Sequence, residues 1–483
     1  MRFHLHTPRE DIILPWDSAP LPRSLTTRNA ALPHGFEPGV KPLRRCGSSD
    51  WDALRRTALT WFQVSAKISR PCCAALIEEL GSPLFSPVLV FDNALRERWT
   101  LKILLTIFCL TLLVEPALLG QTPQGDGVAR LLEELSNAPG PSGFEGPVRD
   151  IMVRALHGLG IETSTDGLGS VIGVLAGSSE RPRIMLAAHM DEVGAIVRYV
   201  MPEGMVKFQL LGGWLDQALA DQRWIIMTNR GPVPALSGLR SVHVTPSEER
   251  GRVTPRDEVF LDVGARTKEE AEAMGIRPGD AIVASSTFTE FAHGRYVGKA
   301  LDDRVGCVML LETLRRLKAQ GAKTPNTIYF VGTVQEEVGL RGAHTAVEVV
   351  KPDLGISLEA GIAADHPGGR PDLAQERLGA GPVLYLADAA MLVNLKLRDF
   401  LERVAAQNSI AVQTEVTTGG AEDSAALQQF GAGRPAINFA VATRYLHAHN
   451  SEIDRGDLDR AVDLLVKALN LLDAQAVANI SRF

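Results

Sequence analysis

The sequence has few cysteines and no extended run of basic residues. Its 483 residues include five cysteines, four of them within the first 120, so that only Cys307 stands in the long remainder. A single thiol cannot form an intrachain disulfide framework. The formal net charge of -7 at pH 7 and the lack of Lys/Arg runs argue against a nucleic-acid-binding surface. Small substrates or peptides are the partners that this composition favours.

Motifs for several common enzyme mechanisms are missing as well. The chain has no HExxH zinc motif, no GxSxG nucleophile elbow and no phosphate-binding P-loop. It also has no internal repeat or low-complexity tract. What it does have is 45% hydrophobic and 22% charged residues, a globular composition, in a chain too long for one simple core. We therefore expect two or more domains.

The first 120 residues differ from the rest. They hold four of the six tryptophans and show little sustained periodicity, so we assign no fold to 1–95. Residues 96–120 begin with Arg96, Arg98 and Lys102 and continue with an apolar run over 103–114. Positive charge followed by such a run is typical of a signal peptide, and the run is short for a membrane-spanning helix.

This signal-like segment predicts export. Because it begins far from the first residue, one hypothesis is that the true start lies near residue 95 and that the upstream residues are a mis-assigned extension. The segment has no A-x-A cleavage pattern, which leaves open a buried helix or a single membrane tether through 103–114. An exported or membrane-anchored protein is the expectation, with a cytoplasmic protein as the alternative.

Helical and strand-like patterns alternate from residue 121 onward. Val128, Leu131, Leu132 and Leu135 have the i, i+3, i+4, i+7 spacing of a helix with one buried stripe. Such alternation predicts an α/β fold, an α/β/α sandwich around a mostly parallel sheet, formed by 121–200 and 296–483. Further helices are expected at 147–159 and 305–321, and apolar strands at 184–188, 326–334, 353–360 and 436–445.

The segment 201–295 has a different sequence pattern, in which short strand-like pieces lie close together with turn residues between them. The pieces are WIIMT, SVHVTP, EVFLDVGA and DAIVASSTF. The one evident helix is short, opening with a capping box from Thr267 to Glu270 and ending at Gly275. We expect a small β-rich domain inserted into the α/β domain.

Acids and histidines follow the ends of the predicted strands or precede a helix. Ligands of open α/β sheets bind at the carboxyl edge of the strands, so we expect five segments to meet in one crevice. The residues concerned are His189 and Asp191, Asp302 and Asp303, Glu336 and Glu337, Glu359, and His447.

Several carboxylates that meet without basic partners would repel one another, and divalent cations would remove that repulsion. Two histidines and three or four carboxylates suit zinc, cobalt or manganese, and a shared carboxylate can bridge two ions about 3.5 to 4 Å apart. Asp191 is placed to fix the tautomer of the His189 imidazole. Each feature alone has an ordinary interpretation, as a surface pair, a helix cap or a solvated acidic face. Their coincidence at strand ends favours the metal site.

Eight segments stand in a distinctive order: PSGFEGPVRDIM, DGLGSVIGVLAG, AAHMDEVGAIV, FLDVGARTKEEAEAMGI, GKALDDRVG, VGTVQEEVGLRGA, AADHPG and TRYLHAHNSEI. This ordered set resembles the glutamyl aminopeptidase family, which includes the tetrahedral and deblocking aminopeptidases and members with the older label endoglucanase. The resemblance covers roughly 128–472 and nothing upstream. It implies a metallo-aminopeptidase that acts on peptide substrates with two divalent metal ions per subunit, zinc or cobalt, or else manganese.

The resemblance also implies a role for each matching residue. Asp302 would bridge the two ions, and Glu336 would be the general base that takes a proton from the attacking water. Asp191, which fixes the His189 imidazole, is predicted with Glu336 as a catalytic residue. Glu359 stands where the family more often has aspartate, and its longer reach can alter metal spacing or preference. The full set of implied metal ligands is His189, Asp302, Glu337, Glu359 and His447.

The resemblance further implies that 201–295 is a β-barrel-like dimerisation domain of a homo-oligomer, up to a dodecamer built from dimers. Three alternatives stay open: a related two-metal carboxypeptidase or deacylase, a non-catalytic metal-binding scaffold, and a glycosidase, which would leave the histidines unexplained.

Cys307, inside an apolar helix, is expected to serve packing and not catalysis. Asp423, in the loop TTGGAEDSA, can be a turn residue, and no specificity is assigned to it.

Overall fold

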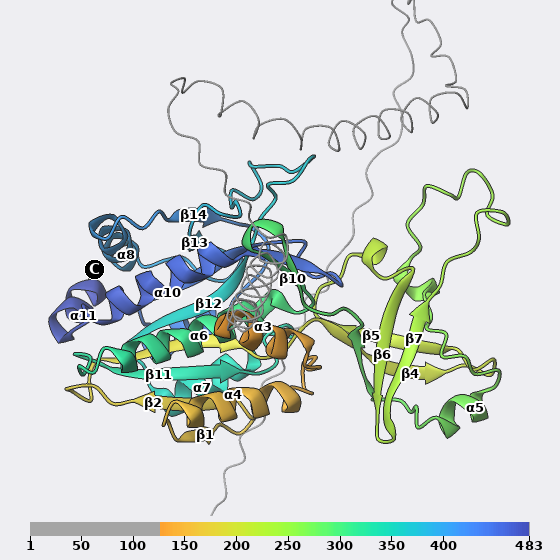
Figure 1. Ribbon diagram of the computed structural model, residues 1–483, viewed down its shortest axis with the longest axis horizontal. Helices are drawn as coiled ribbons and strands as arrows, with labels where there is room; N and C mark the ends of the chain where they lie inside the picture. Colours follow the sequence, from red (N-terminus) through yellow and green to blue (C-terminus); the bar gives the residue numbers. More distant parts are fainter. Residues whose placement is uncertain (1–125, 483) are drawn as a thin grey trace, which may run out of the picture. The chain divides into compact units, whose positions relative to one another are not determined.

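The structure of the chain, a computed structural model, describes residues 126–482. The unassigned region 1–95 and the signal-like segment 96–120 lie outside the described residues, so the expectations for them stay predictions. Within the described part, no helix is both long and apolar enough to cross a membrane. The described residues form two β-sheets, the larger of which is flanked by helices (Figure 1).

The larger sheet has eleven strands and a parallel centre. Strands β11, β3, β12 and β15 lie side by side and pair in parallel, and antiparallel strands continue the sheet on both sides. The sheet is therefore mixed, and the expected parallel arrangement holds at its centre. The strands are β1 Thr163–Thr165, β2 Val171–Leu175, β3 Arg183–His189, β9 Thr289–Phe291, β10 Arg295–Gly298, β11 Thr327–Thr333, β12 Leu354–Ile362, β13 Val383–Ala387, β14 Gln413–Val416, β15 Ala436–Arg444 and β16 Ser451–Asp454.

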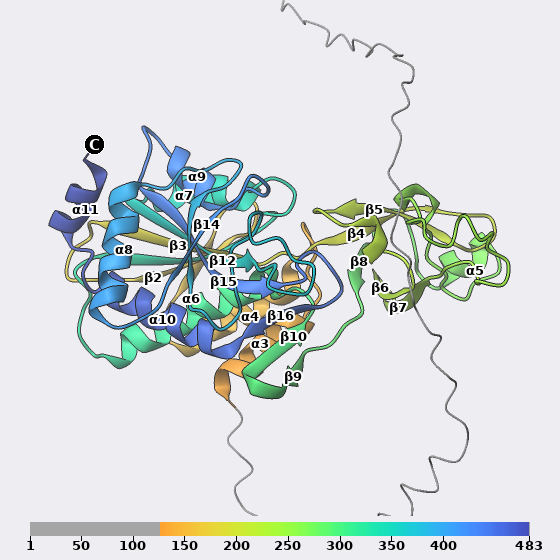
Figure 2. The same ribbon diagram turned by 90° about the horizontal axis from the view of Figure 1, so that it is seen from above.

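Helices cover both faces of this sheet, as expected for a sandwich. Helix α6 packs on β3 and β12 with α3, α4 and α10 beside it, and α7 and α9 pack on the opposite face (Figure 2). The expected helices at 128–135, 147–159 and 305–321 are all present. The helices are α3 Gly127–Asn137, α4 Gly146–Gly158, α6 Leu301–Ala319, α7 Arg341–Val350, α8 Leu395–Gln407, α9 Ser424–Gln429, α10 Arg455–Leu469 and α11 Ala474–Ser481.

Alternate residues of β3 belong to different cores. Leu186 and Ala188 pack in the cluster on the α6 side, whereas Met185 and Ala187 pack in the cluster that includes residues of α7 and α9. Because successive strand residues point to opposite faces, His189 points to the α7 and α9 side. A strand buried on both faces reads as a continuous apolar run, which is why the sequence pattern was sufficient to identify it.

The smaller sheet has five strands in the order β5-β4-β8-β6-β7. It includes the expected strands around WIIMT and DAIVASSTF, and the short helix α5, Lys268–Ala273, begins after Thr267, whose side chain accepts a hydrogen bond from the Glu270 backbone. The strands are β4 Gly194–Val200, β5 Val206–Leu211, β6 Gln222–Thr228, β7 Gly231–Ser237 and β8 Ala281–Ala284.

Two expectations for the inserted segment need correction. Its sheet runs from Gly194 to Ala284, not from 201 to 295, because β4 already belongs to it and β9 and β10 belong to the larger sheet. Only four residues separate β3 from the equally apolar β4, so composition does not mark the boundary. SVHVTP forms turns and no strand; Val242 and Val244 are 55% and 73% exposed, so no neighbouring surface covers them.

Candidate metal centre

Three neighbouring strands place their polar residues at one level of the sheet. His189, the last residue of β3, is paired with Thr333 of β11. Ser357 of β12 is paired with Ala187, which puts Glu359 level with His189. Glu359 therefore lies within β12, three residues before its end, and not at the end of the strand as expected. Glu359 and His189 nevertheless lie close together, as expected, because their side chains project from the same face of the sheet.

The predicted ligands come together in two groups that share one carboxylate. One side-chain ligand atom from each of His189, Asp302 and Glu359 lies within 4.8 Å of the other two, and the same holds for Asp302, Glu337 and His447. Nε2 of His189 is 3.0 Å from Oδ1 of Asp302, and Nε2 of His447 is 3.3 Å from Oδ2. The two oxygens of Asp302 thus face different histidines, which is the arrangement that a bridging ligand requires.

The burial, hydrogen bonding and pKa of the carboxylates indicate whether divalent ions fit this site. Oε1 of Glu337 and Oε2 of Glu359 are buried and have no hydrogen-bond partner among the described residues. Burial raises the pKa of Glu337 to about 8. Burial, followed by the charges of Glu422 and Asp303, raises the pKa of Glu359 well above its usual range. Buried carboxylates without a cation are costly, so a pair of cations fits this donor set.

The His189 ring is oriented by the chain that follows it. Its Nδ1 is 3.1 Å from the backbone carbonyl of Asp191 and 3.6 Å from the Asp191 carboxylate. The carbonyl of Asp191 is therefore the nearer partner of Nδ1, and the carboxylate, which was expected to fix the tautomer, is the more distant one. A proton on Nδ1 donated to that carbonyl leaves Nε2 free to bind a cation.

The Asp191 carboxylate also binds the backbone of the two adjacent glutamates, Glu336 and Glu337. Its Oδ1 accepts from the backbone N–H of Glu336 over 3.0 Å, and its Oδ2 accepts from the N–H of Glu337 over 3.2 Å. The Ser142 hydroxyl also donates to Oδ2, over 2.6 Å. A turn with Gln335 at a φ of 56° leads into this pair. One buried carboxylate thus fixes the backbone from which both glutamate side chains project.

Glu336 projects toward the first group of ligands. Its Oε2 is 3.9 Å from Nε2 of His189, and its side chain is buried. Burial is the main cause that raises its pKa well above the usual range, with the charge of His189 opposing it. A raised pKa is what a carboxylate needs to accept and return a proton near neutral pH.

The adjacent aspartates Asp302 and Asp303 have separate roles. Asp303 belongs to neither ligand group, and its carboxylate accepts from the backbone N–H groups of Gly306 and His189 over 2.9 and 3.1 Å. It therefore caps the start of α6 and fixes β3. Cys307, one turn further, packs in the core, and burial raises its pKa to about 12, which agrees with a structural residue.

The inserted segment contributes to the surroundings of the second group. A Cβ atom on Gly213 would lie 3.1 Å from Nδ1 of His447, and one on Gly212 would lie 2.9 Å from Oε2 of Glu337. His449 is buried, and its ring meets that of Trp224 edge-on at 4.3 Å between centroids. Sequence patterns do not reveal such contacts, because the two segments are far apart in the chain.

Two acids near the centre, Glu422 and Asp423, were given no role on sequence grounds. Asp423 is fully buried, and its Oδ2 accepts from the Thr333 hydroxyl over 2.5 Å, so it is more than a turn residue. Burial and the charge of Asp302 raise the pKa of the adjacent Glu422 to about 8. Both stand at the start of α9, where the sequence signal was only an acidic pair in a glycine-rich loop.

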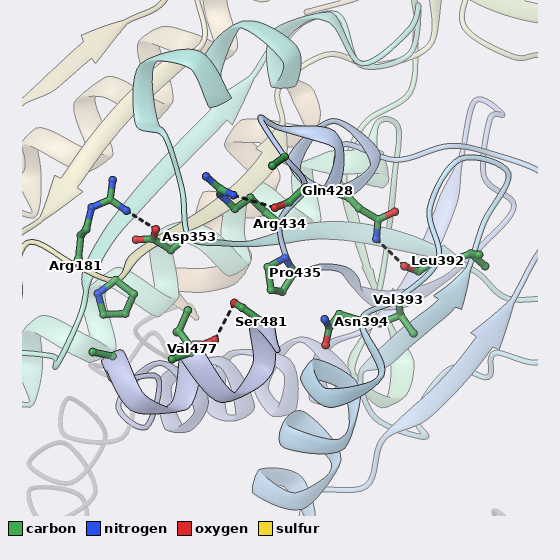
Figure 3. Close-up of a pocket in the computed structure, with 15 residues that line it drawn as sticks. Arg181, Asp353, Leu392, Val393, Asn394, Gln428, Arg434, Pro435, Val477 and Ser481 are labelled. Carbon is green, nitrogen blue, oxygen red and sulfur yellow. Dashed lines mark hydrogen bonds and ion pairs between the residues drawn. The ribbon is translucent and has the colours of Figure 1, made fainter. Parts of the chain in front are cut away.

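A cavity of about 850 Å³ lies elsewhere, at the amino ends of the central strands (Figure 3). Its lining includes Pro182 before β3, Asp353 before β12 and Pro435 before β15, together with Val477 and Ser481 of α11. None of its lining residues belongs to the two ligand groups. The cavity is therefore separate from the carboxyl edge of the sheet, where the polar residues gather.

Comparisons of the sequence identify a matching family and similar proteins. The pattern of the family described as M42 glutamyl aminopeptidase matches residues 169–464. FrvX of Escherichia coli (strain K12) is 36% identical over 73% of this chain and 98% of its own length. A glutamyl aminopeptidase of Lactococcus lactis subsp. cremoris is 32% identical over 73% of this chain and 98% of its own. A lysyl aminopeptidase of Pyrococcus furiosus is 32% identical over 70% of this chain and 95% of its own length.

Solved structures show the same fold. The TET aminopeptidase from the marine sediment archaeon Thaumarchaeota archaeon SCGC AB-539-E09 is 39% identical and has a TM-score of 0.71, covering 74% of this chain and 100% of its own. The TET1 peptidase of Pyrococcus horikoshii, which can assemble into a tetrahedron or a large octahedral shell, is 28% identical with a TM-score of 0.65, covering 71% and 99%. The chain thus belongs to the M42 glutamyl aminopeptidase family and is a peptide hydrolase.

Proposed function

We propose that this protein removes residues from the free N-terminus of peptides with a pair of divalent ions bound at the candidate metal centre. The observation that carries the proposal is the position of Asp302, whose two oxygens face His189 and His447 in separate ligand groups. Zinc or cobalt, or else manganese, suits the mixture of imidazole and carboxylate donors. The ions when bound would acidify a water molecule and polarise the scissile carbonyl group.

The residues of the chain supply the remaining steps. Glu336 takes the proton of the attacking water and delivers it to the leaving amine, which its buried position and raised pKa support. The carbonyl of Asp191 keeps Nδ1 of His189 protonated, so that Nε2 stays available as a ligand. The carboxylate of Asp191 holds the backbone of Glu336, and so fixes the base relative to the ligands.

The preference for a free α-amine separates this function from its nearest alternative, a two-metal carboxypeptidase or deacylase. The test is hydrolysis of a panel of aminoacyl-anilides and of the same anilides with an acylated α-amine. We expect turnover of the free-amine series and none of the acylated series; the reverse result would identify a deacylase. Because the relatives include a glutamyl and a lysyl aminopeptidase, the panel includes acidic, basic and apolar residues.

We also propose that the protein is a homo-oligomer built from dimers through the inserted segment. The assembling TET1 relative supports this, as do the exposed apolar side chains of Leu239, Val242, Val244 and Val253. Light scattering of the purified protein measures the mass. A charged substitution, Val244→Asp, should lower that mass if the loop forms the contact, because burying an unpaired charge is unfavourable.

Export or membrane anchoring through the segment 96–120 remains a proposal that rests on its charge and apolar pattern. N-terminal sequencing of the protein from its native source, after separation of membrane, secreted and cytoplasmic fractions, tests it. A mature start near residue 121 in the secreted fraction supports export. A cytoplasmic protein that begins near residue 1 would contradict it.

A further inference from the structure

The two carboxylate oxygens of Glu359 have different environments. Oε1 accepts a hydrogen bond from the Ser357 hydroxyl over 2.5 Å, whereas Oε2 has no hydrogen-bond partner among the described residues. Oε2 lies 3.9 Å from Nε2 of His189. Ser357 is 0% and Glu359 1% exposed. The protein therefore fixes one oxygen and leaves the other free.

The strand itself sets this pairing. Residues two apart on a strand point to the same face, so Ser357 lies directly beside Glu359 on β12. Strand β12 is paired with β3 on one side and with β15 on the other, which fixes its backbone. The hydroxyl is thus held at a constant position relative to the carboxylate.

A glutamate ligand needs such a restraint more than an aspartate does. Glutamate has one more rotatable bond, and its last torsion is broad. An unrestrained carboxylate can bind a cation through one oxygen or through both. A hydroxyl that donates to Oε1 uses one lone pair of that oxygen and restrains rotation of the carboxylate, which favours binding of a cation through the free Oε2.

We propose that Ser357 is a positioning residue that makes Glu359 a one-oxygen ligand, through Oε2, of the divalent ion held together with His189 and Asp302. This inference rests on the metal centre proposed above. Ser357 donates to Glu359 alone of the two glutamate ligands, and the other, Glu337, has a buried Oε1 without a hydrogen-bond partner among the residues described. The effect of Ser357 is therefore confined to one of the two ions.

The test is a metal titration that does not depend on activity. Metal-stripped full-length protein is titrated with cobalt(II) against a competing chelator, and the visible absorption of the bound cobalt is recorded. Ser357→Ala should weaken the binding of one of the two ions 10- to 100-fold, leave the other unchanged and alter the cobalt spectrum. Ser357→Thr keeps the hydroxyl and should restore the affinity.

The matched control is Ser136→Ala, which removes another fully buried hydroxyl, one that donates to the Lys299 carbonyl over 2.7 Å. It should leave both affinities unchanged. If Ser357→Ala does not fold, as judged by circular dichroism, Ser357→Cys takes its place, since a thiol is a weak donor of similar size, and the same loss is expected.

A second variant separates this inference from the proposed metal centre. In a Glu359→Gln background, which lacks the anionic ligand, Ser357→Ala should cause no further loss, because Ser357 acts only through Glu359. Equal affinities of wild type and Ser357→Ala, with a weakened Glu359→Gln, would overturn the role of Ser357 alone. Two tightly bound ions in Glu359→Gln would instead contradict the metal centre.

Discussion

The backbone N–H of Glu336 donates to Oδ1 of Asp191 over 3.0 Å. This hydrogen bond connects the proposed base to the segment that carries a proposed metal ligand, His189. Since the same carboxylate accepts from the N–H of Glu337 over 3.2 Å, the base and a ligand of the second group share one anchor. The adjacent glutamates project from one fixed turn and act on different partners.

Asp191→Asn should lower kcat 10- to 100-fold and leave both ions bound. The amide keeps the shape of the side chain, but its NH2 group cannot accept from backbone N–H donors. The measurement is steady-state kinetics with metal content determined by mass spectrometry. A variant with wild-type kcat would show that Asp191 does not position Glu336.

Glu336→Gln should keep both ions and lose turnover by about 10² to 10⁴, because the amide cannot take a proton from water. Glu336→Asp, which keeps the carboxylate at a shorter reach, should retain more activity. Metal content is measured on the same samples as activity. Substantial turnover by a fully loaded Glu336→Gln variant would remove Glu336 from the role of base.

The sequence predicted the central strands and the candidate ligands for a physical reason. Strands such as β3 and β11 are covered on both faces, so their apolar runs are unambiguous, and a polar residue directly after them is conspicuous. Contacts between distant segments leave no such pattern. Gly213 near His447, and Thr333 donating to Asp423, depend on tertiary packing that single-sequence periodicity does not encode.

Gly213→Ala should weaken the binding of one ion, because the added Cβ would lie 3.1 Å from Nδ1 of His447 and displace that ring. We expect about tenfold weaker binding, comparable with the loss of a residue that supports a ligand. Gly238→Ala is the control, since its Cβ would meet nothing within 4 Å. Equal metal affinity in both variants would show that the glycine segment does not constrain His447.

Glu376 makes the free energy of unfolding depend on pH to an extent that can be measured. Its side chain is 1% exposed, and burial raises its pKa from 4.5 to about 8. The folded state therefore holds a proton that the unfolded state has lost between these values. The stabilising contribution is complete below pH 4.5 and is lost as the pH rises through 8.

Glu376→Gln keeps a neutral group of the same shape and should remove this loss. The free energy of unfolding of the variant minus that of wild type should increase by on the order of 3 kcal/mol as the pH rises from 5 to 8. Chemical denaturation at several pH values measures it. Parallel pH profiles of the two proteins would show that Glu376 is not protonated in the folded state.

The most direct measurement is the activity of metal-stripped protein on an aminoacyl-anilide as cobalt or zinc is returned stepwise, with bound ions counted per subunit. We expect no turnover without metal and full turnover at two ions per subunit, as the sharing of Asp302 between two ligand groups requires. Turnover by the stripped protein, or full turnover with one bound ion per subunit, would contradict the two-ion centre.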